Sequence, residues 1–247
     1  MVIRSVLDTA FFQDIEIKDE IFVLSKFRQV RYRKNQIVFN QGDPGHDMYI
    51  VKSGALKIYR EDDRREIIFG HQFPGETIGE LEVIHYDNRR LASVATIEDS
   101  VLWAINKSDL EELIKVYPII LRKLFYVVSE RLRQADRKLE YLAFLDSRVR
   151  VANLLLDLYS NFGKETSEGY VINWKITRQH FANMIGLNRE SATRALQELQ
   201  NQGIIKLSNR YITILNIPVL QKLSGAYHDS TELREWHSTH KYDTPKY

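Results

Sequence analysis

Three charged side chains with complementary chemistry stand close together in the stretch NRESATRALQEL, residues 188–199. Arg189, Glu190 and Arg194 share one side of an expected helix with Thr193. The other side is apolar at helical spacing: Ala192, Ala195, Leu196 and Leu199. An arginine can donate two hydrogen bonds to O6 and N7 of guanine, and a glutamate can accept one from N4 of cytosine. This Arg-Glu-Arg triplet (Arg189, Glu190 and Arg194) therefore has side chains able to distinguish DNA bases.

The same triplet has a plainer interpretation. Arg189 and Arg194 could simply solvate a helix surface, with Glu190 pairing Arg194 one turn further on. In an isolated helix this interpretation would be preferred. The choice therefore depends on the elements that position the triplet.

The surrounding residues predict two short helices joined by a tight turn. Thr177 is a suitable N-cap for a helix that ends at Ile185, Gly186 suits the turn, and Asn188 caps a second helix that runs to Gln202. Two helices joined in this way form a helix-turn-helix. The triplet then lies in the first two turns of the second helix, the part that enters the major groove in such motifs.

Local charge and a following hairpin favour the DNA-reading interpretation. Residues 175–215 carry six lysines and arginines against two glutamates, a local charge of +4, although the whole chain has a net charge of only +2. The segment IIKLSNRYITIL predicts two strands around Ser208 and Asn209, which would form a wing beside the second helix.

A different periodicity precedes this region. After Pro118, apolar residues recur at alternating steps of four and three, close to 3.5 residues per turn, and form an apolar seam: Leu121, Phe125, Val128, Leu132, Ala135, Leu139 and Leu142. This spacing predicts a helix that pairs with a second copy in a parallel homodimer. A helix packed only on its own domain is the alternative. The segment FLDSRVRVANLLLDLYSNFG predicts a further amphipathic helix that ends at Gly163.

The first part of the chain predicts an all-β domain. From Phe27 to about Ile105, short segments alternate in polarity, as at Leu56/Ile58 and Val101/Trp103, with expected turns at glycines 42, 45, 54, 70 and 75. We therefore divide the chain into residues 1–117 (a β domain), 118–146 (a dimerisation helix), 147–217 (a winged helix) and 218–247 (a tail). The polar segment KETSEGY, directly after Gly163, is expected to be a loop. The tail follows the wing and lacks sustained periodicity.

Composition excludes several classes of protein. The 247 residues are 44% hydrophobic, enough for one or two folded domains, and contain no cysteine, which excludes disulfides and cysteine-ligated iron–sulfur clusters. We find no signal peptide and none of the common catalytic motifs, and therefore expect a cytoplasmic protein that is not an enzyme and has no catalytic residues. His237-x-x-His240 has metal-like spacing but no third ligand, and no metal site is expected.

The segment ITRQHFANMIGLNRESATRALQELQNQGII resembles the DNA-binding motif of the Crp/Fnr superfamily, and the resemblance covers roughly residues 15 to 215. It implies an α+β fold with an N-terminal antiparallel β-roll of the cyclic-nucleotide-binding type, a long coiled-coil dimer helix and a C-terminal winged helix-turn-helix. It also implies a dimeric transcriptional regulator that reads an inverted TGTGA-like repeat in double-stranded DNA and contacts RNA polymerase. Arg189 and Arg194 would then contact guanines and Glu190 a cytosine. The other expected DNA contacts are Thr193, Thr177, Arg178 and Gln179.

The resemblance also places an effector site in the roll. In PGETIGELEVIHYDNRRLASV, Gly79 would begin a short helix, Glu80 would accept a ribose hydroxyl and Arg90 would hold a phosphate. The expected site residues are Gly79, Glu80, Leu81, Arg90, Leu91, Ala135 and Asp136. Leu91, Ala135 and Asp136 depart from the cyclic-AMP pattern, which has hydroxyl residues there, and Glu82 stands where a small residue is usual.

These departures leave three alternatives for control of the protein. They are a small effector other than cyclic AMP, cyclic AMP itself, and no effector, with control by protein abundance; we expect the first. Alternatively, Glu80 and Arg90 could form an internal ion pair. Haem, found elsewhere in the family, would need a histidine, and the folded region offers His46, His71, His85 and His180. Lone histidines are more often surface or core residues than ligands, so no haem is expected.

Overall fold

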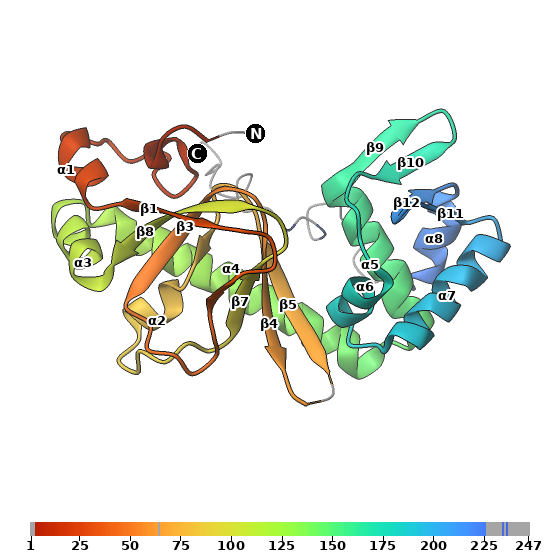
Figure 1. Ribbon diagram of the computed structural model, residues 1–247. Coiled ribbons are helices and arrows are strands. Elements are labelled where there is room, and N and C mark those ends of the chain that lie inside the picture. Colours follow the sequence, from red (N-terminus) through yellow and green to blue (C-terminus); the bar gives the residue numbers. More distant parts are fainter. Residues whose placement is uncertain (1–2, 64, 226–233, 235, 237–247) are drawn as a thin grey trace. The chain divides into compact units, whose positions relative to one another are not determined.

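The computed structural model describes residues 3–63, 65–225, 234 and 236 (Figure 1). Its contacts divide these residues into two compact units. The first comprises residues 3–62 and 69–135, and the second comprises residues 63, 65–68 and 136–225 with Arg234 and Trp236. Within the described ranges, no helix combines the length and apolar character that crossing a membrane requires.

Two four-stranded antiparallel sheets form the body of the first unit. Their orders are β1-β8-β3-β6 and β2-β7-β4-β5. The strands are β1 (Arg28–Tyr32), β2 (Ile37–Phe39), β3 (Asp47–Ser53), β4 (Leu56–Glu61), β5 (Glu66–Gln72), β6 (Thr77–Ile78), β7 (Ser93–Thr96) and β8 (Ser100–Asn106). A short 3-10 turn at Val6–Asp8 and helix α1 (Glu20–Ser25) precede them, α2 (Glu80–Ile84) lies between β6 and β7, and α3 (Lys107–Val116) follows. The predicted β-roll is therefore confirmed.

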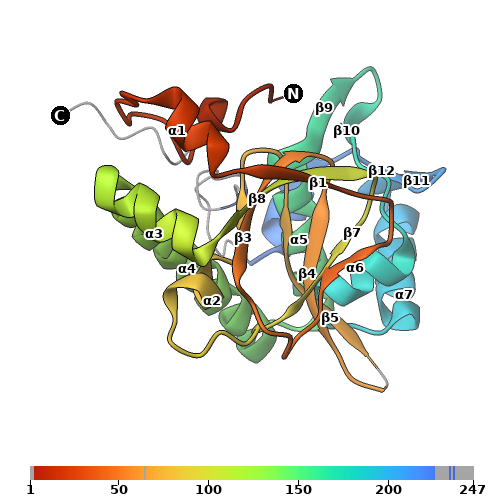
Figure 2. The same cartoon turned by 60° about the vertical axis from the view of Figure 1, so that its left-hand side comes forward.

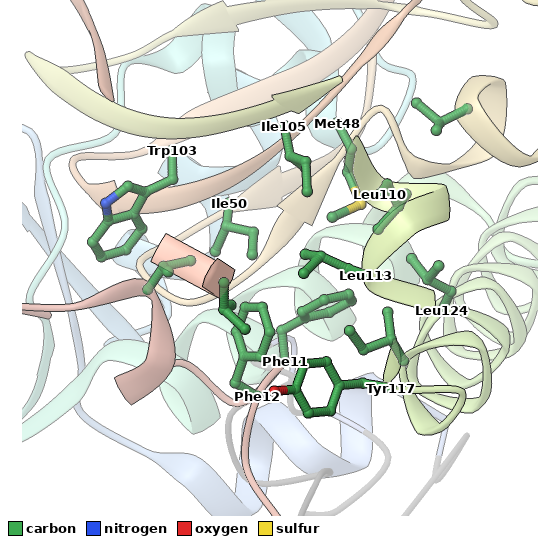
Figure 3. Close-up of a cluster of buried hydrophobic side chains, with 14 of the residues drawn as sticks. Phe11, Phe12, Met48, Ile50, Trp103, Ile105, Leu110, Leu113, Tyr117 and Leu124 are labelled. Carbon is green, nitrogen blue, oxygen red and sulfur yellow. The ribbon is translucent and has the colours of Figure 1, made fainter. Parts of the chain in front are cut away.

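The central strands β3 and β8 are buried on both faces. Tyr49 and Val51 point into the core between the sheets, whereas Met48 and Ile50 point into a second core. Figure 3 shows this second core, where the outer face of the sheet meets the N-terminal segment, α3 and the start of α4. Its members include Phe11, Phe12, Met48, Ile50, Trp103, Ile105, Leu110, Leu113, Tyr117 and Leu124. Because alternate residues face two different cores, these strands read as nearly continuous apolar runs.

Helix α4 (Ile119–Phe144) is the long helix that the apolar repeat predicts. Ile120 and Leu124 are fully buried against the roll. In Figure 2, α3 and α4 lie on the same side of the sheet that contains β3 and β8. Packing against the roll thus uses one face of α4 and leaves its seam on another.

The second unit is built around α5 (Ser147–Phe162), which is capped by Asp146 and ends at Gly163 as predicted. It continues with β9 (Gly163–Thr166), β10 (Gly169–Ile172), α6 (Arg178–Met184), α7 (Arg189–Asn201), β11 (Ile205–Ser208), β12 (Tyr211–Ile214) and α8 (Ile217–Leu223). Its four strands form one antiparallel sheet in the order β11-β12-β10-β9. The predicted helix-turn-helix and wing are both present.

Three details differ from the sequence prediction. The polar stretch KETSEGY, expected as a loop, belongs mostly to the hairpin β9–β10, which pairs with the wing strand β12. Helix α8 occupies the beginning of the expected tail, from Pro218 to Leu223, and Leu220 is fully buried. Gly70 lies inside β5 rather than in a turn. The remainder of the expected tail lies outside the described residues, apart from 224–225, Arg234 and Trp236.

Candidate functional site

The two helices of the helix-turn-helix begin and end at the predicted caps. The Thr177 hydroxyl accepts a hydrogen bond from the backbone N–H of His180 at 3.1 Å, and Asn188 accepts one from Ser191 at 2.7 Å. Gly186 turns the chain between them with φ of 65°, a conformation that favours glycine. Ala192, Leu196 and Leu199 are buried. These contacts fix which side of α7 faces solvent.

The exposed side of α7 carries the Arg-Glu-Arg triplet. Arg189, Glu190 and Arg194 are all exposed. Among the described residues, none of the three forms an ion pair, and the pairing of Glu190 with Arg194 that would merely solvate the helix is absent. Each side chain therefore keeps its hydrogen-bonding groups available for a partner outside the chain.

The other predicted DNA contacts differ in how far their hydrogen-bonding groups already have partners within the chain. Thr193 donates its hydroxyl to the carbonyl of Arg189 at 2.7 Å, and Thr177 is engaged in capping α6. Gln179 is exposed, and its amide donates to Asn183 at 2.7 Å. Arg178 is half-buried, and this burial lowers the pKa of its guanidinium. All four belong to the helix-turn-helix, and the triplet has the most exposed charged groups.

The wing ends in a tight two-residue turn. Asn209 and Arg210 have φ of 49° and 68°, as in the turns that connect neighbouring strands directly. The carbonyl of Arg210 accepts a hydrogen bond from the N–H of Ile176 at 3.1 Å, which ties the wing to the segment before α6. Arg210 itself is exposed at the tip. A further cationic group thus stands on the same unit as the triplet, in a loop tied by a backbone hydrogen bond.

The seam of α4 is largely exposed in the single chain. The exposed fractions are 53% for Leu121, 72% for Phe125, 62% for Leu132, 64% for Leu139 and 39% for Leu142. Val128 is half-buried and Ala135 is exposed. A row of large apolar side chains that the described chain leaves mostly exposed is unusual for a monomer.

In the roll, Arg90 is enclosed, and both of its terminal nitrogens donate hydrogen bonds. Its side chain is 3% exposed, and its guanidinium lies over the ring of Phe39, 4.0 Å from the centroid. Nη2 donates to the carbonyl of Asp47 at 2.7 Å, and a Cβ on Gly45 would lie 2.6 Å from Nε. A Cβ on Gly79 would lie 2.4 Å from Nη1. The two glycines therefore allow the backbone to close around the guanidinium.

The buried partner of Arg90 is Glu82. Nη1 of Arg90 donates to Oε2 of Glu82 at 3.1 Å, while the backbone N–H of Leu91 donates to Oε1 at 3.1 Å. The Glu82 side chain is only 7% exposed. The side chain of Leu91 is exposed, so its contribution here is the backbone N–H. We name the Arg90 guanidinium and the Leu91 N–H together the anion seat.

Glu80 pairs with a different arginine, which rules out the suggested Glu80–Arg90 pair in this structure. Arg131 of α4 approaches Oε1 of Glu80 with its Nε at 2.5 Å, and its Nη2 donates to the carbonyl of Thr77 at 2.6 Å. Glu80 is 1% exposed. Sequence reasoning did not select Arg131, because only the fold brings it to a residue 51 positions earlier.

The remaining predicted effector residues are less closely assembled. Gly79 precedes α2 with φ of 77°, and Leu81 is half-buried in that helix. Ala135 and Asp136 are exposed on α4, and no hydrogen bond or ion pair in the described chain joins them to Arg90, Glu82 or Glu80. The contacts of the described residues therefore join the first segment of the predicted site to α4 through Arg131 and not through Ala135 or Asp136.

The histidines do not assemble a metal site within the described residues, where no group of three potential ligands occurs. His46 and His85 are exposed, His71 packs near Phe73, and His180 packs against Trp174. His228, His237 and His240 lie outside the described residues.

Comparison with known proteins matches both units. Residues 29–117 match the cyclic nucleotide-binding domain, and residues 149–223 match the Crp-like helix-turn-helix domain. The CRP-like protein Clp of Xanthomonas campestris is 31% identical over 190 residues, which cover 74% of this chain and 82% of that protein. The chain belongs to the Crp/Fnr family of transcriptional regulators.

Other relatives of this Crp/Fnr chain agree. The cyclic AMP receptor protein of Thermus thermophilus is 29% identical over 205 residues, covering 81% of this chain and 90% of that protein. The structure of the c-di-GMP responsive global regulator CLP of Xanthomonas campestris superposes with a TM-score of 0.73 at 28% identity, covering 79% and 97% of the two chains. These relatives are transcriptional regulators and not enzymes.

Beyond the Crp-like match, two C-terminal residues of this family member pack on α5. Arg234 donates to the carboxylate of Asp157 at 2.8 Å and to the side-chain oxygen of Asn153 at 3.1 Å. The N–H of Trp236 donates to Asn161 at 2.8 Å. Burial raises the pKa of Asp157 to about 6 even though the Arg234 charge acts in the opposite direction. Part of the expected tail therefore belongs to the packed unit.

Proposed function

We propose that this Crp/Fnr chain is a homodimeric, sequence-specific DNA-binding regulator of transcription that reads an inverted TGTGA-like repeat. One observation carries the proposal. Arg189, Glu190 and Arg194 are exposed on the first two turns of α7 and have no ion pair within the described chain. Arginine to guanine and glutamate to cytosine is the pairing that this half-site offers in the major groove.

The exposed seam of α4 supports the dimer. Two parallel copies of the seam would bury its leucines and Phe125 against each other, at the spacing that two-stranded coiled coils use. A two-fold dimer presents two identical recognition helices, and such dimers read inverted repeats whose half-sites are about 34 to 36 Å apart. The symmetry of the DNA site thus follows from the symmetry of the seam.

Control by a small molecule is the third part of the proposal. The cyclic nucleotide-binding match and the effector-responsive relatives support an effector that acts through the roll. The Glu80–Arg131 pair gives a physical route, because it joins the predicted effector segment to α4, and the seam lies on the same helix. An effector that shifts Arg131 would change the register of the two α4 helices and hence the separation of the recognition helices. Contact with RNA polymerase belongs to the same proposal through the family resemblance.

The test is DNA binding at fixed salt, because phosphate contacts make affinity depend on ionic strength. The wild-type chain, Arg194→Ala and the control Arg31→Ala are titrated onto a duplex with the inverted TGTGA repeat. Arg31 is exposed on β1 of the other unit. Each bidentate contact is worth about 1 to 3 kcal/mol, so Arg194→Ala should weaken binding roughly 5- to 150-fold per half-site.

A base substitution separates reading from simple charge attraction. Replacing the contacted guanine should weaken wild-type binding but leave the residual binding of Arg194→Ala unchanged. Arg31→Ala should bind both duplexes like the wild-type chain. If Arg194→Ala bound the TGTGA repeat as tightly as wild type, the assignment of this arginine would be wrong.

A further inference from the structure

The anion seat of the roll is already filled. Its two donors, Nη1 of Arg90 and the N–H of Leu91, converge on the two oxygens of the Glu82 carboxylate, both at 3.1 Å. A guanidinium and a backbone N–H that bind two oxygens of one anion can hold a carboxylate or a phosphate equally well. The geometry is therefore that of a bound anion, supplied here by the chain itself.

Burial makes this pairing hard to exchange. The side chains of Arg90 and Glu82 are 3% and 7% exposed. If an external phosphate took the seat, the Glu82 carboxylate would have to lose both donors and still remain beside a second anion in a region that water barely reaches. Leaving one member of a buried ion pair without its partner is strongly destabilising. The roll therefore strongly favours its own carboxylate over a phosphate from solution.

The Nε donor of Arg90 is unused. Nε is buried and has no hydrogen-bond partner among the described residues, while Nη2 is held by the carbonyl of Asp47. If the Glu82 carboxylate were removed, Nη1 would keep only its 3.4 Å hydrogen bond to the Gly79 carbonyl, and Nε and the Leu91 N–H would lack an acceptor. Donors left in this way around a buried positive charge form a site for a tetrahedral oxyanion.

We propose that Glu82 is a built-in substitute for an effector anion: it occupies the anion seat, so the wild-type roll accepts no phosphate group there. The inference narrows the effector of the proposed regulator to molecules that present no anionic group to Arg90. It also predicts that removing one carboxylate converts the roll into a phosphate-binding site. DNA binding by the wild-type protein would then need no cyclic nucleotide.

The first experiment is calorimetry of the full-length wild-type protein with cyclic AMP. We expect no saturable heat up to millimolar nucleotide. Saturable binding in the micromolar range would overturn the proposal, because the nucleotide phosphate would then have displaced Glu82. The measurement contains no DNA, so a result that overturns this proposal leaves the proposed DNA-reading function untouched.

The second experiment opens the seat. Thermal unfolding of Glu82→Ala is followed in sodium phosphate and in sodium chloride of equal ionic strength. Phosphate should raise the Tm of Glu82→Ala by several degrees over chloride, since a ligand that binds only the folded state stabilises it. Phosphate also stabilises folded proteins in general, so the wild-type protein and the double variant Glu82→Ala/Arg90→Met should show the same, smaller shift between the two salts. Asp87→Ala, which removes an exposed carboxylate from the following loop, is the matched control and should behave like wild type.

If Glu82→Ala does not fold in chloride, far-UV circular dichroism of Glu82→Ala and of Glu82→Gly is recorded in both salts. Phosphate should then restore the folded spectrum. A folded Glu82→Ala whose Tm shift between the two salts is no larger than that of the wild-type protein would refute the proposal. The proposal would also be refuted if phosphate restored the folded spectrum of neither Glu82→Ala nor Glu82→Gly.

Discussion

Shortening one leucine of the α4 seam should weaken dimerisation without unfolding the chain. Leu132 is 62% exposed in the single chain, so replacing it by alanine removes few contacts within the protomer. Burying a whole leucine side chain is worth about 1.5 to 3 kcal/mol, and the exposed part of Leu132 accounts for roughly 1 to 2 kcal/mol of this. A dimer contains the residue twice, so Leu132→Ala should cost about 2 to 4 kcal/mol, or roughly 30- to 1,000-fold in Kd.

Sedimentation equilibrium over a concentration series measures this Kd directly. Ile21→Ala is the matched control, since Ile21 is 83% exposed on α1 and lies off the seam. The control should dimerise like the wild-type protein. A wild-type chain that stays monomeric at micromolar concentration, or a Leu132→Ala variant with an unchanged Kd, would refute the assignment of the seam.

Two further predictions concern the second unit. Arg210→Gly should leave thermal stability equal or slightly higher, because glycine adopts φ of 68° without strain. It should weaken DNA binding uniformly across sequences and reduce the slope of log affinity against log salt concentration by about 0.9 per half-site. A steeper slope would contradict this prediction. The carboxyl of Asp157 has a pKa of about 6 in the folded protein and 3.8 in the unfolded chain. Its protonation therefore contributes roughly 3 kcal/mol to the free energy of unfolding, fully below pH 4, and this contribution is lost as pH rises through 6. Urea unfolding of wild type and Asp157→Asn at pH 4 and 6.5 measures this as a pH-dependent difference; a constant difference would count against it.

The features that were predicted correctly depend on short-range signals. Thr177 and Asn188 each cap a helix through an N–H three residues later, and the turn needs only Gly186. The long helix follows from a repeat that continues for more than 20 residues. Such signals are complete within one segment, so no knowledge of the tertiary structure is needed to interpret them.

The features that were not predicted depend mostly on contacts between segments that are distant in the sequence. All four residues of β9 are exposed, so this strand has no alternation of polarity to reveal it and exists because β10 pairs with it. Helix α8 is too short for a clear period. Arg131 meets Glu80 across 51 positions and Arg234 meets Asp157 across 77, and only the fold creates those pairs. The sequence marks Glu82 as an unusual residue, but only the structure places it on the two donors of the anion seat.

The enclosed Glu82 carboxylate also has an evolutionary consequence. Glutamate codons differ from those of alanine and glycine at the second base alone, so one nucleotide change exchanges a carboxylate for a side chain that leaves the seat open. The glycines at 45 and 79, which shape the space around Arg90, would stay as they are. On the proposed role of Glu82, a lineage carrying this roll stands one mutation away from a receptor with a vacant phosphate site, and the reverse change in such a receptor would fill its site with a carboxylate.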